Sequence, residues 1–166
     1  VWTHLVDIRK SFEPRAEELA KKYALAPYTM FIGSGALWGE TILFSMCILE
    51  EMQWKRTRYI TSADFFHGTL ELVEPGVPVF LFMGEDENRK LDERVRAFLN
   101  RGVSGDTDIN IIDTAEFAIP GLDDEFRVIV SPWILSSLVT DRLAAYYETV
   151  TKHNLNYRRY YHQFDY

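Results

Sequence analysis

The chain has 166 residues, the length of one ordinary domain, and 47% of them are hydrophobic, so a sizeable core is expected. Its formal net charge of −7 argues against binding to nucleic acid or to an anionic membrane surface, because both need clustered Lys and Arg. The single cysteine, Cys47, excludes an intrachain disulfide and favours a reducing, cytoplasmic location.

Apolar and helical segments alternate along the chain. Helices are predicted at 4–23, 36–54, 88–101 and 132–153, and strands at 28–35, 58–62, 77–84, 108–113 and 126–131. This alternation with short connections predicts a doubly wound α/β fold, in which a five-stranded parallel sheet has helices on both faces. Ligands of such sheets bind beyond the carboxyl ends of the strands.

Two segments follow predicted strands at that edge. Gly33-Ser34-Gly35 ends the first strand and opens a helix, so its backbone N–H groups could hold an anion; a tight turn explains it equally well. Ser62 ends the second strand. The dinucleotide fingerprint is incomplete because Trp38 stands where its last glycine is required, so NAD binding is rejected.

Glu51 is a candidate general base. It lies on the stripe of Phe44, Cys47 and Ile48 near the end of a strongly apolar helix. The helix dipole and partial burial at that position would both raise the pKa of a carboxyl toward values useful for proton transfer. The alternative is that Glu51 emerges into solvent where the helix ends.

His67 is the second candidate. It follows the strand that comes after Glu51, so the two side chains are expected to flank one crevice as a base and an acid. The alternative for His67 is a packed histidine near the core. In the aromatic and basic tail, 154–166, Arg158 or Arg159 could add positive charge at a substrate site, or the tail could simply pack on a neighbour.

The ordered set "LEEMQW", "ADFFHGTLELVEPGVP" and the "RRYY…DY" ending resembles the second sugar-isomerase (SIS) domain of the fructosamine-type sugar-phosphate deglycases. It is similar, more distantly, to the isomerase part of glucosamine-6-phosphate synthase. The resemblance covers essentially residues 1–166 and implies an SIS-type, flavodoxin-like fold. It also implies a glutamate as the proton-transferring base and a histidine sixteen positions later, which are Glu51 and His67, with Glu50 as the second choice.

The resemblance further implies how the protein is organised. Family members carry two SIS domains, and the first has a Ser/Thr-rich loop for the sugar phosphate that nothing in this sequence matches. Together with the start at Val1 in a predicted helix, this predicts that 1–166 is the C-terminal SIS domain of a longer protein that forms a homodimer or higher oligomer. In the family the histidine is often supplied across a subunit boundary.

The function implied is cleavage of a 6-phosphorylated sugar–amine adduct, such as glucoselysine- or fructoselysine-6-phosphate, to a hexose 6-phosphate and a free amine. No metal or redox cofactor is expected, because the substrate nitrogen serves as the electron sink. The tail residues 157–166 lack the lysine that the synthases use near their C-terminus, which argues against amino transfer. The alternatives are a phosphosugar-binding module of a transcription regulator, a phosphosugar aldose–ketose isomerase and a degenerate scaffold domain. The sequence leaves open which amine is released and how it is linked to the sugar.

Overall fold

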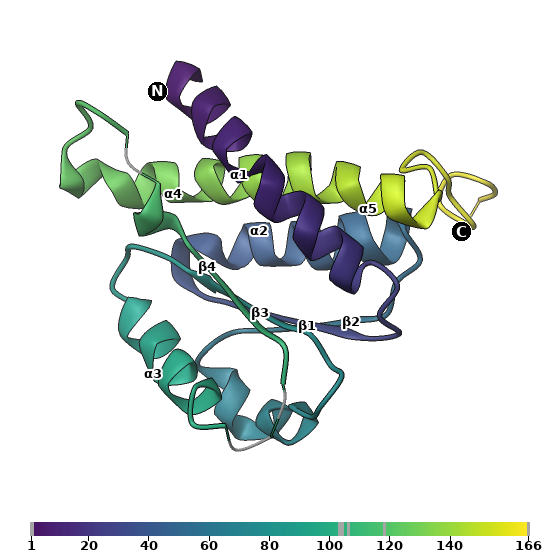
Figure 1. Ribbon diagram of the computed structural model, residues 1–166, viewed down its shortest axis with the longest axis horizontal. Coiled ribbons are helices and arrows are strands. Elements are labelled where there is room, and N and C mark those ends of the chain that lie inside the picture. Colours follow the sequence, from purple (N-terminus) through teal and green to yellow (C-terminus); the bar gives the residue numbers. More distant parts are fainter. Residues whose placement is uncertain (1, 103–104, 106, 118, 166) are drawn as a thin grey trace.

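The computed structural model describes residues 2–102, 105, 107–117 and 119–165, which form a parallel sheet between two helical layers (Figure 1). The strands are β1 (Thr29–Gly33), β2 (Thr57–Ile60), β3 (Val79–Met83) and β4 (Ile109–Asp113), in the order β2-β1-β3-β4. All three strand pairs are parallel. The predicted α/β class with helices on both faces is confirmed.

The helices differ in length from the sequence prediction, and two of them contain π-helical segments. The helices are α1 (Trp2–Tyr23), α2 (Trp38–Ile42), α3 (Arg89–Leu99), α4 (Arg127–Ser136) and α5 (Ala144–Thr151). Helix α2 continues as a π-helical segment, η2 (Leu43–Met52), and a second π-helical segment, η7 (Ser137–Leu143), joins α4 to α5. Short 3₁₀ turns follow β2, of which η3 is Asp64–His67.

The sheet separates two hydrophobic layers. Phe31, Phe80 and Phe82 face α1, α2 and the α4–α5 helix, with the ring of Phe31 stacked on those of Phe80 and Phe82 at centroid distances of 5.2 and 6.0 Å. Met30 and Leu81 alternate with them and face α3 and the 3₁₀ turns. Every residue of β1 and β3 is buried, as expected for central strands covered on both faces.

The predicted fifth strand at 126–131 is wrong, because this segment begins the long helix α4–α5. Val130 and Ile134 are buried whereas Ile129 and Trp133 are exposed, which is helical rather than strand periodicity. Pro132 lies inside the helix instead of starting it. The hydroxyl of Ser131 donates to the Val128 carbonyl at 3.1 Å, the acceptor that the proline nitrogen cannot pair.

The described residues contain one helix, from Asp124 to Thr151, whose length and composition alone would allow it to cross a membrane. In the fold this helix packs through Leu138, Val139 and Leu143 into the core beside α1 and the sheet. It is therefore placed as a core helix of the α/β layer (Figure 1).

Candidate functional site

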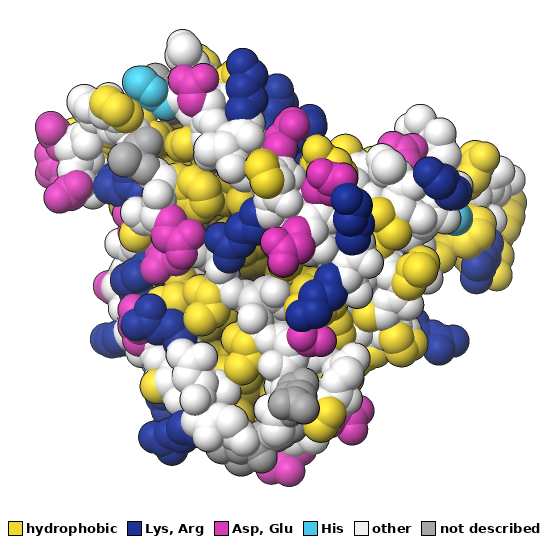
Figure 2. Space-filling model, in the orientation of Figure 1, with side chains coloured by type: hydrophobic (Ala, Val, Ile, Leu, Met, Phe, Trp, Pro, Cys, Tyr) yellow, Lys and Arg dark blue, Asp and Glu magenta, His cyan; other side chains and the backbone are white. Residues whose placement is uncertain are grey.

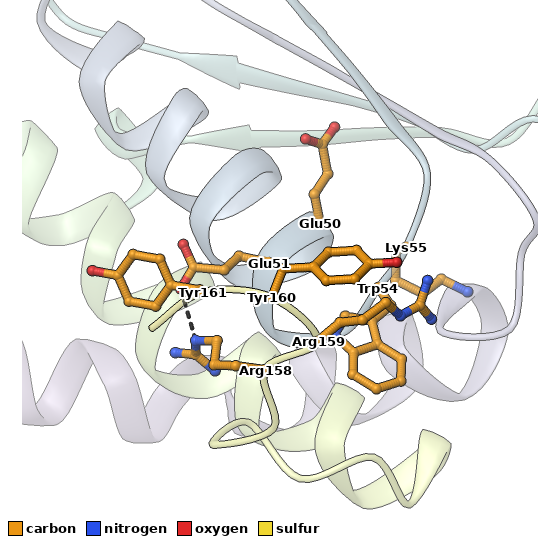
Figure 3. A pocket seen from close by; sticks show the side chains of 8 residues that line it. All are labelled: Glu50, Glu51, Trp54, Lys55, Arg158, Arg159, Tyr160 and Tyr161. Carbon is orange, nitrogen blue, oxygen red and sulfur yellow. Dashed lines mark ion pairs between the residues drawn. The ribbon is translucent and has the colours of Figure 1, made fainter. Parts of the chain in front are cut away.

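A cavity of about 300 Å³ lies where the end of η2 meets the C-terminal tail (Figure 3). Its wall is mostly charged and aromatic and comes from two short stretches of sequence. These are Glu50, Glu51, Trp54 and Lys55 at the end of η2, and Arg158, Arg159, Tyr160 and Tyr161 in the tail. The cavity thus joins segments that stand far apart in the sequence.

Glu51 faces the tail within this cavity. One of its carboxylate oxygens, Oε1, lies 2.8 Å from Nε of Arg158, and the two side chains are 32% and 18% exposed. Figure 3 shows the Glu51 side chain directed toward Arg158 and Tyr161. The predicted desolvation of Glu51 is therefore partial, and the carboxylate is compensated by a guanidinium that the sequence pattern did not assign to it.

Glu50 points away from Glu51 in Figure 3. Its Oε1 accepts a 2.5 Å hydrogen bond from the hydroxyl of Thr57, the first residue of β2. This bond ties the end of η2 to the start of the strand. Glu51 is therefore better placed than Glu50 to act on a ligand under the tail.

Trp54 forms the platform on which the tail rests. It adopts φ 53°, a left-handed conformation that is an outlier for a bulky residue and costs about 1–3 kcal/mol. The Arg159 guanidinium lies 4.3 Å from the centroid of the indole ring, and the His153 ring lies 4.3 Å away in an edge arrangement. Backbone strain at Trp54 thus accompanies a specific stack of tail side chains.

Gln53 fixes the end of α5 to the end of η2. Its side chain is buried, donates to the His153 carbonyl at 2.6 Å and accepts from the Thr151 hydroxyl at 2.7 Å. The His153 ring also packs on Tyr157 at 5.3 Å. These contacts direct residues 157–161 across the cavity, so both predicted tail arginines reach the site.

Lys55 is the third cation of the cavity. Burial lowers the pKa of its ammonium from the ordinary value. Among the described residues neither Lys55 nor Arg159 has a carboxylate within ion-pair distance, in contrast to Arg158. Sequence reasoning missed Lys55 as a cavity residue, although its position directly after the "LEEMQW" motif was a usable signal.

His67 lies elsewhere. It is an exposed residue at the end of η3, followed by Gly68 with φ 135°. The packed-histidine interpretation is therefore wrong. The expectation that Glu51 and His67 of one chain flank one crevice is also wrong, because η2 runs back from the end of β1 to the start of β2, whereas His67 follows the carboxyl end of β2.

The glycine turn after β1 does bind an anion, but the anion is part of the chain itself. The backbone N–H of Ala36 donates to Oδ2 of Asp86 at 2.5 Å. Gly35 has φ 54°, and a Cβ added there would collide with the Asp86 carboxylate. The expected anion contact at Gly33-Ser34-Gly35 is thus occupied by Asp86, and the adjoining cavity is lined by further acidic residues, Glu85, Glu87, Asp124 and Glu125.

Ser34 and Ser62 bind each other at the carboxyl ends of β1 and β2. The Ser62 N–H donates to Oγ of Ser34 at 2.7 Å, and the Ser62 hydroxyl donates to Oδ1 of Asp92 at 2.5 Å. Asp92 is 1% exposed, and burial raises the pKa of its carboxyl to about 6. The predicted ligand Ser62 therefore has a structural partner within the chain.

The architecture and the known proteins it matches define the class. No protein-family model matches the chain. The structure superimposes with a TM-score of 0.91 on a solved protein described as a phosphosugar isomerase from Bacillus subtilis, at 27% identity, covering 99% of this chain and 49% of that one. The C-terminal domain of glucosamine-fructose-6-phosphate aminotransferase from Francisella tularensis shares the fold at a TM-score of 0.62 and 14% identity. The chain is thus an α/β domain of the SIS type.

Sequence relatives narrow the class to a family. The chain is 30% identical over 148 residues to fructosamine deglycase FrlB of Bacillus subtilis, which is 87% of this chain and 43% of that protein. It is 31% identical over 161 residues to the fructoselysine 6-phosphate deglycase of Escherichia coli, which is 95% of this chain and 43% of that protein. The chain belongs to the fructosamine/fructoselysine-6-phosphate deglycase family as an SIS domain, and it spans less than half of these relatives' length.

Proposed function

We propose that this SIS domain serves a sugar-phosphate deglycase, which cleaves a 6-phosphorylated sugar–amine adduct to a hexose 6-phosphate and a free amine. The observation that carries the proposal is the cavity in which Glu51 lies beside the cationic tail, in a chain of the deglycase family. The relatives' names supply the substrate class, and the carboxylate supplies a base for proton transfer.

In the proposed reaction Glu51 removes a proton from the sugar carbon that carries the nitrogen, next to the carbonyl of the opened sugar. The electron pair of the broken C–H bond forms a carbon–carbon double bond, and the carbonyl oxygen takes up the displaced electron pair and a proton. Glu51 then returns its proton to the former carbonyl carbon while the nitrogen lone pair forms a carbon–nitrogen double bond. Water adds to that imine and the amine leaves, so the sequence is an internal rearrangement and a hydrolysis that need no redox cofactor.

His67 is proposed to assist ring opening by proton transfer at the ring oxygen. It is exposed and lies beyond the carboxyl end of β2, whereas Glu51 lies at the start of that strand. Four strand residues at about 3.3 Å each separate the two edges. His67 therefore acts in the site of another subunit, and each site takes Glu51 and His67 from different copies.

We further propose that the domain is the C-terminal half of a two-SIS-domain protein and that the sugar phosphate binds in the other half. Asp86 supports this division, because its carboxylate fills the turn that a phosphate would need here. A homodimer or larger assembly is supported by exposed apolar side chains of α1 and α4, including Trp2 and Trp133, whose rings stack at 5.6 Å. Figure 2 shows hydrophobic side chains at the surface among charged ones. The cytoplasmic location stays a prediction.

A regulatory module that only binds a phosphosugar is the main alternative, and a phosphosugar aldose–ketose isomerase is the other. The regulator has no need of a carboxylate held by an arginine in the ligand cavity, which favours an enzyme. The isomerase would act on the sugar phosphate without an amine.

The test is an assay of the full-length protein against lysine and aspartate adducts of both linkage types, with fructose 6-phosphate as the isomerase substrate. Release of free amine supports the deglycase. Interconversion of hexose phosphates alone supports the isomerase, and phosphosugar binding without turnover supports the regulator. The isolated 166-residue chain should be inactive because the sugar-phosphate site is proposed to lie in the other half.

A further inference from the structure

One side of the Glu51 cavity carries positive charge that the chain does not compensate. Glu51 is paired with Arg158, and Glu50 is hydrogen-bonded to Thr57. Within the described residues, the ammonium of Lys55 and the guanidinium of Arg159 have no ion pair and no side-chain hydrogen bond. The lining carries three cations, Lys55, Arg158 and Arg159, against the two carboxylates Glu50 and Glu51, and Lys55 and Arg159 have no carboxylate partner, which indicates an anionic ligand group beside them.

The surroundings of Arg159 leave its hydrogen-bonding edge available. One face of the guanidinium lies over the Trp54 ring at 4.3 Å, and a guanidinium donates from its edge, not from its face. In Figure 3 the Arg159 and Lys55 side chains lie together on one side of the cavity, and the Tyr160 ring lies between them and Glu51. A ligand group there would be held at a fixed offset from the base.

The charge pattern distinguishes between ligand groups. A phosphate dianion would meet the carboxylates of Glu50 and Glu51 in the same cavity wall. A zwitterionic α-amino-acid end carries a carboxylate that can bind Lys55 and Arg159 and an ammonium that can bind a glutamate. Its two charges therefore complement both the positive and the negative side chains of the cavity wall. The planar fork of an arginine is also suited to a carboxylate.

Building on the deglycase function proposed above, we infer that Lys55 and Arg159 bind the carboxylate of the amine half of the substrate. The preferred substrates are then adducts whose amine half keeps a free α-amino-acid end, as lysine does when it is linked through its side-chain nitrogen. Trp54 holds Arg159 in place by stacking, and Tyr160 separates this subsite from the reacting carbons at Glu51.

The test compares two substrates in the full-length protein: the 6-phosphofructose adduct of lysine, linked through the side-chain nitrogen, and the matching adduct of cadaverine, which lacks only the carboxylate. We expect kcat/KM at least about tenfold higher for the lysine adduct. Lys55→Met and Arg159→Met should each raise KM for the lysine adduct about tenfold or more, with a much smaller effect on kcat, and thereby reduce its advantage over the cadaverine adduct. Arg56→Met, at an exposed position outside the cavity lining, is the matched control.

Equal losses on both adducts, or equal wild-type kcat/KM values, would overturn the inference. If the wild-type protein cleaves neither these adducts nor the adducts of the other linkage type, the proposed function fails, and calorimetry then tests the subsite separately with free lysine, cadaverine and inorganic phosphate. Binding of lysine over cadaverine that Arg159→Met abolishes supports the carboxylate subsite. Binding of phosphate alone, or of none of the three, overturns it.

Discussion

Nε of Arg158 lies 2.8 Å from Oε1 of Glu51, which links the C-terminal tail to the end of the π-helical segment η2. The pair closes one end of the cavity, and the stack of Arg159 on Trp54 closes the other. The candidate base therefore depends on the tail for its electrostatic environment.

Glu51→Gln should lower turnover of the full-length protein by at least about 100-fold, because the amide keeps the shape of the carboxylate but cannot accept a proton. Stability should change little, since the lost ion pair is partly exposed. Glu18→Gln, at an exposed position of α1 outside the cavity lining, is the matched control and should keep its activity, and Glu50→Gln should lose less than Glu51→Gln because the Glu50 carboxylate is bound to Thr57. Near-normal rates for Glu51→Gln, measured as amine release, would remove Glu51 from the mechanism, and a loss confined to Glu50→Gln would transfer the role to its neighbour.

His67→Ala should also be strongly impaired without a lower melting temperature, because the side chain is exposed. If each site takes Glu51 from one subunit and His67 from the next, mixed dimers of the two inactive variants contain one intact site of two. Random mixing of equal amounts should then restore about a quarter of wild-type activity. Activity of co-expressed Glu51→Gln and His67→Ala chains checks this, and no recovery in proven mixed dimers would show that both residues act from one chain.

Sequence patterns are sufficient for most of the sheet. Residues 77–84 form a continuous apolar run, and β3 is indeed buried along its whole length. The segment 126–131 was wrongly predicted as a strand, because a short run of Val and Ile is equally typical of a strand and of a buried helix turn. Its direct continuation into the helical pattern after Pro132 favoured the helix.

The candidate site was predicted only in part. Glu51 and His67 were assigned to one crevice, although a helix that follows a parallel strand must return to the opposite edge before the next strand begins. Applied to the predicted element order, this rule places Glu51 and His67 at opposite edges of the sheet. The position of the C-terminal tail was harder to predict from sequence. The approach of Arg158 to Glu51 depends on the buried Gln53 contacts and on the left-handed backbone of Trp54, and no sequence pattern indicates either of them.

Trp54 offers a test of stored backbone strain. With φ 53°, any L-residue at this position is less favourable than glycine. Trp54→Gly and Trp54→Ala both lose the indole contacts with Arg159 and His153, so the difference between them isolates the backbone. The glycine variant should be more stable than the alanine variant by about 1 kcal/mol in urea unfolding. An alanine variant of equal or higher stability would mean that the backbone relaxes out of the left-handed region.

Asp92 should make stability depend on pH in a direction opposite to that of a salt-bridged carboxylate. Burial raises the pKa of its carboxyl from the ordinary 3.8 to about 6 in the folded chain. Between these pH values the folded state binds more protons at this group than the unfolded state, so its contribution to stability is full below pH 4 and is lost as the pH rises through 6. The difference between a pKa of 3.8 in the unfolded chain and about 6 in the folded chain corresponds to about 3 kcal/mol in the free energy of unfolding.

Asp92→Asn removes this titration while keeping an acceptor for the Gly84 N–H and a polar partner for Ser62. The variant should therefore gain stability relative to the wild type as the pH rises from 4.5 to 7.5, by about 2 kcal/mol. Urea unfolding of both proteins at each pH gives the difference directly, and the other titrating groups cancel in the comparison. Asp7→Asn, at an exposed position of α1, is the control and should show no such trend. A difference between Asp92→Asn and wild type that stays constant across this range would show that Asp92 is ionised in the folded protein throughout, held by Ser62 and Gly84 despite its burial.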